Sequence, residues 1–386
     1  MRYIAKTLYG FEQILANELL AIGVKKVKPI NRAVIFWGNK ETLYQVNYAS
    51  RIALSVLEPI SEFSITSKQD LYDRCMEIDW SEYMDVDDSF SVVPVVNSKI
   101  FPHTGYPALV VKDAIVDYFR DKFGRRPSVN LTDPDLVINL HISNSKVDMS
   151  IDSTVIPLYK RGYRREHGDA SLNECMAAGM LKLSGWNPEQ PLVDPMCGSG
   201  TILIEGALMA SNIPGGMFRN GFGFQKWKSY DERLFNRVKA KEEEKITVVK
   251  SHITGSDISE EAVRNAMSNI DGAHLNGIVK VKTSDIKTFS PSYEGGFLVT
   301  NPPYGQRIVP EDIMDLYDTI GSSLKHNFAG YHAWILTSEK SLLNKIGLKP
   351  YSKYNLYNGS IPCYFVGYEL YKGSLKTRGN VKNVDE

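Results

Sequence analysis

The chain has 386 residues, and its 45 basic side chains match its 45 acidic ones, so the formal net charge is zero. The length predicts two or three domains, since a domain has about 100 to 200 residues, and 43% hydrophobic residues exclude a disordered or fibrous protein. Four widely spaced cysteines, histidines without metal-ligand spacing and no run of ~18 apolar residues predict a cytoplasmic protein without a disulfide scaffold, a metal or a membrane helix.

The N-terminal region alternates between strand and helix patterns in the spacing of its apolar side chains. In chain order these are a strand at residues 2–8, a helix at 11–22, a strand at 33–37 and a helix at 43–49. This order predicts a small α+β domain over residues 1–60. The segment that follows, residues 64–88, is rich in Asp and Glu and predicts a solvated face that repels phosphate.

Two further patterns divide the rest of the chain. A strand at residues 90–96, a helix at 109–123 and strands at 136–142 and 146–150 predict a second α+β domain over residues 61–158. Beyond it, short apolar runs at 191–194, 252–257, 297–300 and 332–336 alternate with helix patterns such as 201–210 and 260–269. Because this alternation is typical of a parallel, doubly wound sheet, we predict an α/β domain over residues 159–386.

A glycine loop follows the first apolar run of that domain, in the sequence LVDPMCGSGT at residues 192–201. Gly198 and Gly200 allow a sharp turn and a close approach to a ligand. The loop is not a dinucleotide fingerprint, because Leu203 stands where the third glycine would be. Asp194 would repel a pyrophosphate but can accept from an ammonium group, so we expect a cationic cofactor. We interpret Cys197 as a small packed residue rather than as a nucleophile.

Two more acids follow strands of the same domain. Asp257 ends the run at 252–257, where it can accept from both hydroxyls of a ribose, and Asp285 follows the run at 278–281, where it can accept from the amine of adenine. Each acid alone would be interpreted as a helix N-cap. Together with the glycine loop, however, they resemble the S-adenosylmethionine pocket of class I methyltransferases.

The tetrapeptide Asn301-Pro302-Pro303-Tyr304 follows another apolar run. Its prolines stiffen the loop, and the Asn301 oxygen with the Pro302 carbonyl can accept both protons of a planar amino group. Tyr304 can stack on the ring that bears the amine. A plain Asn-Pro turn is the alternative. The tetrapeptide resembles the signature of amino-methyltransferases that act on adenine N6, cytosine N4, guanine N2 or a protein glutamine.

A basic junction, KRGYRR, occupies residues 160–165 between the second and third predicted domains. Because the net charge is zero, any nucleic-acid partner has to be bound by such a local group of cations. A solvated linker is the alternative interpretation.

Over residues 1–370, these segments resemble the THUMP-domain RNA guanine-N2-methyltransferases, in particular the bacterial RlmL type, which acts on 23S ribosomal RNA. The resemblance is carried by residues 158–164, 172–183, 194–201, 213–227 and 301–305. Long RlmL proteins have a second methyltransferase domain, and this sequence stops after one, so we expect a single activity.

The resemblance implies a ferredoxin-like domain over residues 1–60, a THUMP RNA-binding domain over 61–158 and a Rossmann-like class I methyltransferase domain over 159–386. It implies that S-adenosylmethionine is held by Ser171, Leu172, Asp194, Pro195, Cys197, Gly198, Gly200, Asp257, Ile258 and Asp285. It further implies that the target base is held by Asn301, Pro302, Pro303 and Tyr304. From the cations of the basic junction, we predict RNA contacts at Lys160, Arg161, Arg164 and Arg165.

The leading hypothesis is methylation of guanine N2 in structured RNA, with 23S rRNA or a ribosome precursor as the partner. Several alternatives stay open from the sequence. Within enzymes they are guanine-N2 methylation of tRNA and amino-methylation of a protein glutamine or of DNA adenine. Outside enzymes, the alternative is a non-catalytic RNA-binding factor that stabilises ribosome precursors.

Overall fold

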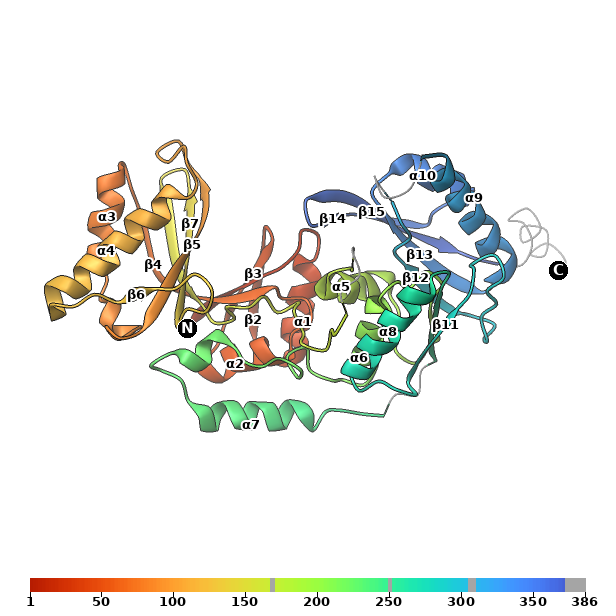
Figure 1. The fold of residues 1–386 in the computed structure, drawn as a ribbon, viewed down its shortest axis with the longest axis horizontal. Coiled ribbons are helices and arrows are strands. Elements are labelled where there is room, and N and C mark those ends of the chain that lie inside the picture. Colours follow the sequence, from red (N-terminus) through yellow and green to blue (C-terminus); the bar gives the residue numbers. More distant parts are fainter. Residues whose placement is uncertain (167–170, 249–251, 305–309, 372–386) are drawn as a thin grey trace, which may run out of the picture. The chain divides into compact units, whose positions relative to one another are not determined.

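The structure, a computed structural model, describes residues 1–166, 171–248, 252–304 and 310–371 (Figure 1). The chain forms two compact units, and each unit contains segments that are distant in the sequence. Unit 1 comprises Met1–Thr7, Leu15–Lys160 and Arg219–Glu244, and unit 2 comprises Leu8–Ile14, Arg161–Phe218 and Lys245–Glu386. The three domains predicted from the sequence therefore do not coincide with the two units.

Unit 1 is built on one eight-stranded sheet in the order β2-β3-β1-β4-β8-β7-β5-β6 (Figure 1). The strands are β1 (Arg2–Lys6), β2 (Lys26–Ile30), β3 (Ala33–Trp37), β4 (Ser55–Ser64), β5 (Ser89–Asn97), β6 (Ser128–Val129), β7 (Leu136–Ser143) and β8 (Lys146–Asp152). Strand β4 pairs with both β1 and β8, so the two predicted α+β domains share a continuous sheet. The predicted boundary at residue 60 falls inside β4, at an irregularity between Pro59 and Ser61.

The helices of unit 1 include one inside the acidic segment 64–88, for which we predicted a solvated face. They are α1 (Glu12–Ile22), of which the part from Leu15 onward lies in unit 1, α2 (Lys40–Ala49), α3 (Lys68–Met76), α4 (Tyr106–Phe123) and α7 (Glu232–Glu243). In α3 the acids are exposed or half-buried, but Leu71 and Cys75 are fully buried. The apolar positions four residues apart place one face of this helix in the core.

Residues 219–244 belong to unit 1 although they lie between segments of unit 2 in the sequence. Their aromatic side chains pack on α2: the ring of Phe224 stacks on Tyr44 at 4.4 Å between centroids, and Phe235 meets Phe224 edge-on at 5.1 Å. Aromatic contacts of this kind add to the stability gained from burial alone. The insertion is thus held by the core of unit 1.

Unit 2 is built on a seven-stranded sheet in the order β11-β10-β9-β12-β13-β15-β14 (Figure 1). The strands are β9 (Leu192–Asp194), β10 (Ile253–Asp257), β11 (Val279–Thr283), β12 (Gly296–Thr300), β13 (Tyr331–Thr337), β14 (Ser352–Asn358) and β15 (Ile361–Glu369). The helices are α5 (Glu174–Ser184), α6 (Thr201–Ala210), α8 (Glu260–Gly272), α9 (Pro310–Asn327) and α10 (Lys340–Ile346). The strands from β11 to β13 are parallel, which confirms the predicted α/β class, whereas the antiparallel β14–β15 hairpin was not predicted.

The strand order of this sheet reverses at β9, which has β10 on one side and β12 on the other. In open parallel sheets, ligands bind beyond the carboxyl ends of the strands at such a reversal. Asp194 ends β9 and Thr300 ends β12, so the two side chains reach the same edge of the sheet. This edge is where a ligand site is expected.

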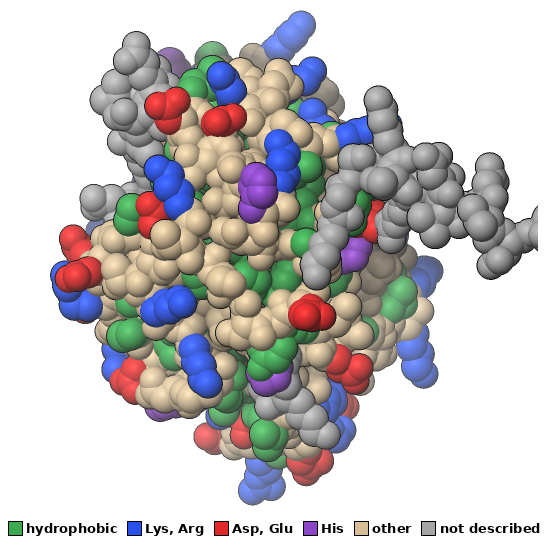
Figure 2. Space-filling view, turned by 90° about the vertical axis from the view of Figure 1, so that its right-hand side faces the viewer, with side chains coloured by type: hydrophobic (Ala, Val, Ile, Leu, Met, Phe, Trp, Pro, Cys, Tyr) green, Lys and Arg blue, Asp and Glu red, His purple; other side chains and the backbone are tan. Residues whose placement is uncertain are grey.

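The surface and the described helices add three observations. On the face drawn in Figure 2, Lys and Arg side chains are interspersed with Asp and Glu rather than gathered in one area. None of the helices in the described part of the chain is long and apolar enough to cross a membrane. Among the described residues, no group of three or more His, Cys, Asp and Glu side chains is placed to hold a metal ion.

Candidate active site

A cavity of about 210 Å³ lies at the carboxyl edge of the parallel sheet in unit 2. It is lined by Ser171, Leu172, Asp194, Met196, Cys197, Gly198, Ser199, Thr201, Ile202, Ala262, Asn265 and Asn301. Six of these were predicted from the sequence. The other six were not predicted. Ser199 and Thr201 could have been found because they flank the predicted Gly200. Ala262 and Asn265 are three residues apart and so share one face of α8.

The glycine loop contributes Gly198 and Ser199 to the lining of the cavity. Gly198 and Gly200 have φ angles of +52° and +80°, a left-handed conformation that side chains with a Cβ rarely adopt. Helix α6 begins directly after Gly200, which supplies no side chain to cap it. The first N–H groups of α6 are therefore left for another acceptor.

Asp194 is the acidic group of the cavity, and only 1% of its surface is exposed. Its Oδ1 accepts hydrogen bonds from Thr300 Oγ1 at 2.7 Å and from the Met196 N–H at 3.2 Å. Burial nevertheless raises the pKa of Asp194 to about 7. A cation in the cavity would favour the ionised carboxylate, so this acid suits a positively charged ligand.

The other acids predicted for the cofactor do not line the cavity. Asp257 accepts from the N–H groups of Gly198 at 2.9 Å and Ser259 at 3.0 Å, so it holds the glycine loop to the end of β10. Asp285 accepts from the N–H of Lys287 at 2.9 Å, within its own turn. Their predicted contacts with ribose and adenine stay predictions.

Pro195 and Ile258, which follow Asp194 and Asp257 in the sequence, also lie outside the cavity lining. The Pro195 carbonyl accepts from Ser256 Oγ at 3.2 Å, and Ile258 is 71% exposed. Cys197 does line the cavity and is buried, and burial raises the pKa of its thiol well above the usual value. The thiol therefore stays protonated, in agreement with its interpretation as a packed residue.

The loop after β12 brings Asn301 to the cavity wall. Its Oδ1 atom is buried, and no donor in the described part of the chain reaches it. Pro302 is buried, Pro303 is exposed, and neither lines the cavity. Tyr304 also lies outside the lining, and its hydroxyl accepts from Asn358 Nδ2 of β14 at 2.9 Å. The unpredicted β14–β15 hairpin thus holds the tyrosine.

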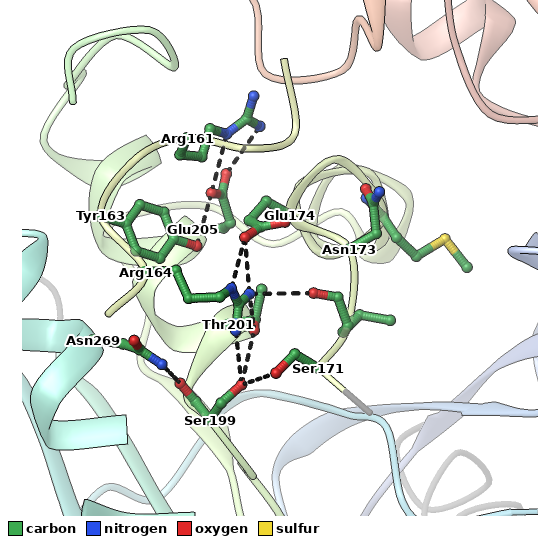
Figure 3. A network of polar contacts seen from close by, with 12 residues as sticks. Arg161, Tyr163, Arg164, Ser171, Asn173, Glu174, Ser199, Thr201, Glu205 and Asn269 are labelled. Carbon is green, nitrogen blue, oxygen red and sulfur yellow. Dashed lines mark hydrogen bonds and ion pairs between the residues drawn. The ribbon is translucent and has the colours of Figure 1, made fainter. Parts of the chain in front are cut away.

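The structure corrects the prediction that Arg161 contacts RNA. Arg161 is 1% exposed, and its guanidinium donates to both carboxylate oxygens of Glu205 on α6, each at 3.3 Å (Figure 3). The Tyr163 hydroxyl donates to the same carboxylate at 3.2 Å. A buried and paired guanidinium is not available to a phosphate, so Arg161 joins the junction to the core of unit 2.

Arg164 is corrected for the same reason. Its guanidinium donates to Glu174 Oε1 at 3.0 Å, Ser199 Oγ at 3.1 Å and Thr201 Oγ1 at 3.0 Å, and its side chain is 9% exposed (Figure 3). Lys160 and Arg165 are exposed, and Arg165 pairs with Asp271. Their contact with RNA stays a prediction.

Taken together, the parallel sheet with its antiparallel β15, the reversal at β9 and the glycine loop define a class I methyltransferase. The family model described as "RMKL-like, methyltransferase domain" matches residues 161–366, "THUMP domain" matches 66–152, and "RlmL ferredoxin-like domain" matches 2–57. The chain therefore belongs to the RMKL-like methyltransferase family, which confirms the resemblance found in the sequence.

Individual relatives agree with this membership. The chain is 38% identical to "Putative RNA methyltransferase slr0064" of Synechocystis sp., over 96% of this chain and 97% of that protein. It is 35% identical to "Ribosomal RNA large subunit methyltransferase K/L" of Psychromonas ingrahamii, over 96% of this chain but only 50% of the relative, so it spans about half that protein's length. The crystal structure of "SMU.472, a putative methyltransferase complexed with SAH" has a TM-score of 0.87 and 29% identity, and the match covers 97% of this chain and 99% of the other.

Proposed function

We propose that this chain transfers a methyl group from S-adenosylmethionine to the N2 amine of a guanine in structured RNA, with large-subunit ribosomal RNA as the substrate. The observation that carries the proposal is the buried Asn301 Oδ1, an acceptor without a donor in the described part of the chain, at the wall of the cavity. An unsatisfied buried acceptor costs roughly 1–3 kcal/mol, and a substrate amine would satisfy it.

The residues of the cavity fit the methionine end of S-adenosylmethionine. Asp194 can accept from the ammonium group, and the uncapped start of α6 offers N–H donors to a negative group. The relative crystallised with SAH, the demethylated product of the same cofactor, supports this assignment. When bound, the cofactor supplies an electrophilic methyl group on a sulfonium.

Asn301 would orient the target nitrogen. Its Oδ1 would accept one N–H of the amine, and the Pro302 carbonyl would accept the other, which turns the nitrogen lone pair toward the methyl group. The carbon–sulfur bond would break as the nitrogen–carbon bond forms, and a neutral thioether would leave, so no strong base is required. The methylated nitrogen would then lose one of its protons to water. The residues contribute by alignment and by keeping water out.

The RNA part of the proposal is supported by the match of the THUMP family model and by the names of the relatives. The test is transfer of tritiated methyl from S-adenosylmethionine to purified ribosomal RNA, tRNA, DNA and protein, followed by mass spectrometry of the nucleosides. We expect N2-methylguanosine in 23S rRNA. Label in tRNA, DNA or protein would name a different substrate, and failure to bind the cofactor would support a non-catalytic RNA-binding factor.

A further inference from the structure

A second cavity, of about 200 Å³, lies within unit 1 and is nearly as large as the cavity of about 210 Å³ in unit 2. Side chains of β1, α2, β4 and β8 line it, together with residues 82–83 and residues 227–229 of the insertion. All of these segments belong to unit 1, and the two linings share none of the described residues. The cavity is therefore separate from the candidate active site.

Aromatic side chains form much of the wall of this cavity, namely Tyr3, Tyr44, Tyr83 and Trp227. Tyr3, Tyr44 and Trp227 are buried and so are fixed by the core, whereas Tyr83 is half-buried. The Asp231 N–H donates to the Tyr44 hydroxyl at 3.0 Å, which fixes the insertion to this wall. Aromatic walls favour a flat, unsaturated ligand, because ring faces stack on one another.

Two polar side chains of the lining have hydrogen-bonding capacity to spare. Trp227 Nε1 is buried, and no acceptor in the described part of the chain reaches it. Among the described residues, none donates a hydrogen bond to the carboxylate of half-buried Glu58. Burial raises the pKa of Glu58 above its ordinary value, although nearby Lys40 opposes this. A ligand that accepts from the indole and donates to the carboxylate would satisfy both groups.

The charged side chains of the lining balance one another. Glu58 and Glu82 are acidic, and Lys40 and Lys228 are basic. Aromatic walls can also hold a cation, but a cation in this cavity would meet two lysines, and an anion would meet two glutamates. The balance favours a neutral ligand.

A nucleobase has all of these properties, since it is flat, neutral and edged with donors and acceptors. Unpaired bases of RNA are held by stacking on aromatic side chains and by hydrogen bonds to their edges. Guanine has two adjacent donors, N1–H and N2–H, and a carboxylate can accept both. Its O6 and N7 atoms are acceptors for an indole N–H. Guanine therefore matches Glu58 and Trp227 best.

We propose that the cavity of unit 1 binds an unpaired guanine of the RNA, with Glu58 and Trp227 at its edge and Tyr83 against its ring. This guanine is bound but not methylated, because the cavity is separate from the site of Asn301. The proposal rests on the proposed function only in taking the base from RNA. It gives the protein a contact that reads one base of its substrate.

The test measures the binding of guanosine 5′-monophosphate to the full-length protein by ligand-observed NMR. Saturating S-adenosylhomocysteine keeps the nucleotide out of the cavity in unit 2. Guanosine 5′-monophosphate should bind about 5-fold or more tightly than uridine 5′-monophosphate, because uracil lacks the pair of adjacent donors. Ribose 5-phosphate, which has no base, should not bind.

Two substitutions in the lining test the assigned contacts. Glu58→Gln should weaken binding of guanosine 5′-monophosphate by about 10-fold, since a charged acceptor is lost. Tyr83→Ala should weaken it by about 5-fold or more, because a ring that stacks on the base is lost. Thermal unfolding shows whether each variant is folded, and Glu58→Gln, which conserves shape, carries the test if Tyr83→Ala is not.

The matched controls are substitutions of the same kind outside the lining. Glu62→Gln lies on the same strand as Glu58, and Tyr72→Ala replaces a half-buried tyrosine of α3. Both controls should leave the binding of guanosine 5′-monophosphate unchanged.

Two RNA pentanucleotides decide whether the guanine comes from RNA or from a free nucleotide. UUGUU should bind more tightly than both UUUUU and guanosine 5′-monophosphate, because Lys40 and Lys228 are close enough to the cavity to contact flanking phosphates. Tighter binding of the free nucleotide than of UUGUU would overturn RNA as the source.

The remaining outcomes separate this proposal from its alternatives. Unchanged binding in Glu58→Gln, or equal binding of the guanosine and uridine nucleotides, would overturn the guanine site. Binding of choline but not of guanosine 5′-monophosphate would assign the cavity to a cation instead. Methyl transfer to RNA without guanosine binding would leave the proposed function standing, and guanosine binding without methyl transfer would leave the cavity assignment standing.

Discussion

The loops after β9 and β12 lie at the same edge of one sheet but differ in how their polar groups are satisfied. In the loop after β9, the hydroxyls of Ser199 and Thr201 are both held by Arg164. In the loop after β12, the Oδ1 of Asn301 is buried, and no donor in the described ranges reaches it. Side chains that are held by hydrogen bonds are ordered before a ligand arrives, whereas an unpaired acceptor side chain gains free energy only when a ligand donates to it. Under the proposed function, the loop after β9 is the preformed cofactor side, and the loop after β12 is the target side that the substrate completes.

The largest effect on activity is expected from a change at Asn301, because this change tests the difference between the two loops most directly. Asn301→Ala should lower kcat by about 100-fold or more, because one removed donor or acceptor at a reacting centre costs roughly this much. Cofactor affinity should change by less than about 2-fold, since the lost contact belongs to the target amine. Single-turnover kinetics and titration with S-adenosylhomocysteine measure the two quantities.

Asn301→Asp is the matched variant, because it keeps an acceptor oxygen at the same place. It should lose less activity than Asn301→Ala. Near-normal turnover of the alanine variant would show that Asn301 has no role in the reaction. A loss of cofactor affinity equal to the loss in kcat would show that Asn301 binds the cofactor rather than the target amine.

The second effect concerns Asp257, which holds the glycine loop through the Gly198 N–H. Asp257→Ala should weaken binding of S-adenosylhomocysteine by about 10-fold or more, because a charge-assisted hydrogen bond to the loop is lost. The kcat at saturating cofactor should fall much less. Asp271→Ala, an exposed acid on α8, is the control, and equal binding by the two variants would contradict the role of Asp257.

The third effect is a pH dependence at Asp194. Its pKa is raised to about 7 by burial, so the carboxyl is protonated and neutral below that pH in the free protein. Only the ionised form attracts an ammonium. Affinity for S-adenosylhomocysteine should therefore rise with pH, by up to about 10-fold per pH unit well below 7, and level off above it.

Asp194→Asn tests the assignment of this titration. The variant should bind more weakly at pH 7.5, and its affinity should be nearly flat across the range in which the unmodified protein changes. Titration at several pH values, with the buffer ionisation heat subtracted, gives both curves. An unmodified protein whose affinity falls as the pH rises would contradict the role of Asp194.

Two kinds of site residue could be predicted from the sequence. One kind is required by the backbone conformation, and the other directly follows a buried strand. Gly198 and Gly200 are needed for positive φ angles, and Asn301 follows an apolar run that had to be a buried strand. The order of strands and helices after residue 190 was predictable for the same reason, since buried parallel strands are short and apolar.

The roles of Arg161 and Arg164 could not be predicted, because the amino-acid sequence of the junction does not show which of its basic side chains are buried. Their partners, Glu205 and Glu174, lie 44 and 10 residues further along the chain, and only the fold brings them together. For the same reason, the sequence did not show that residues 219–244 belong to unit 1. It depends on ring contacts such as Tyr44 with Phe224, between residues far apart in the sequence.

The smallest effect is expected at the two cations of the junction that are exposed, Lys160 and Arg165. Lys160→Ala and Arg165→Ala should each weaken binding of ribosomal RNA only about 2- to 5-fold. Each substitution should also reduce the slope of log affinity against log salt concentration by up to about one. Cofactor affinity should not change, because neither side chain lines the cavity. Arg264→Ala on α8 serves as a control for the loss of one exposed cation. If the junction variants match this control, the junction acts only through its buried arginines, and the RNA is bound by other parts of the chain.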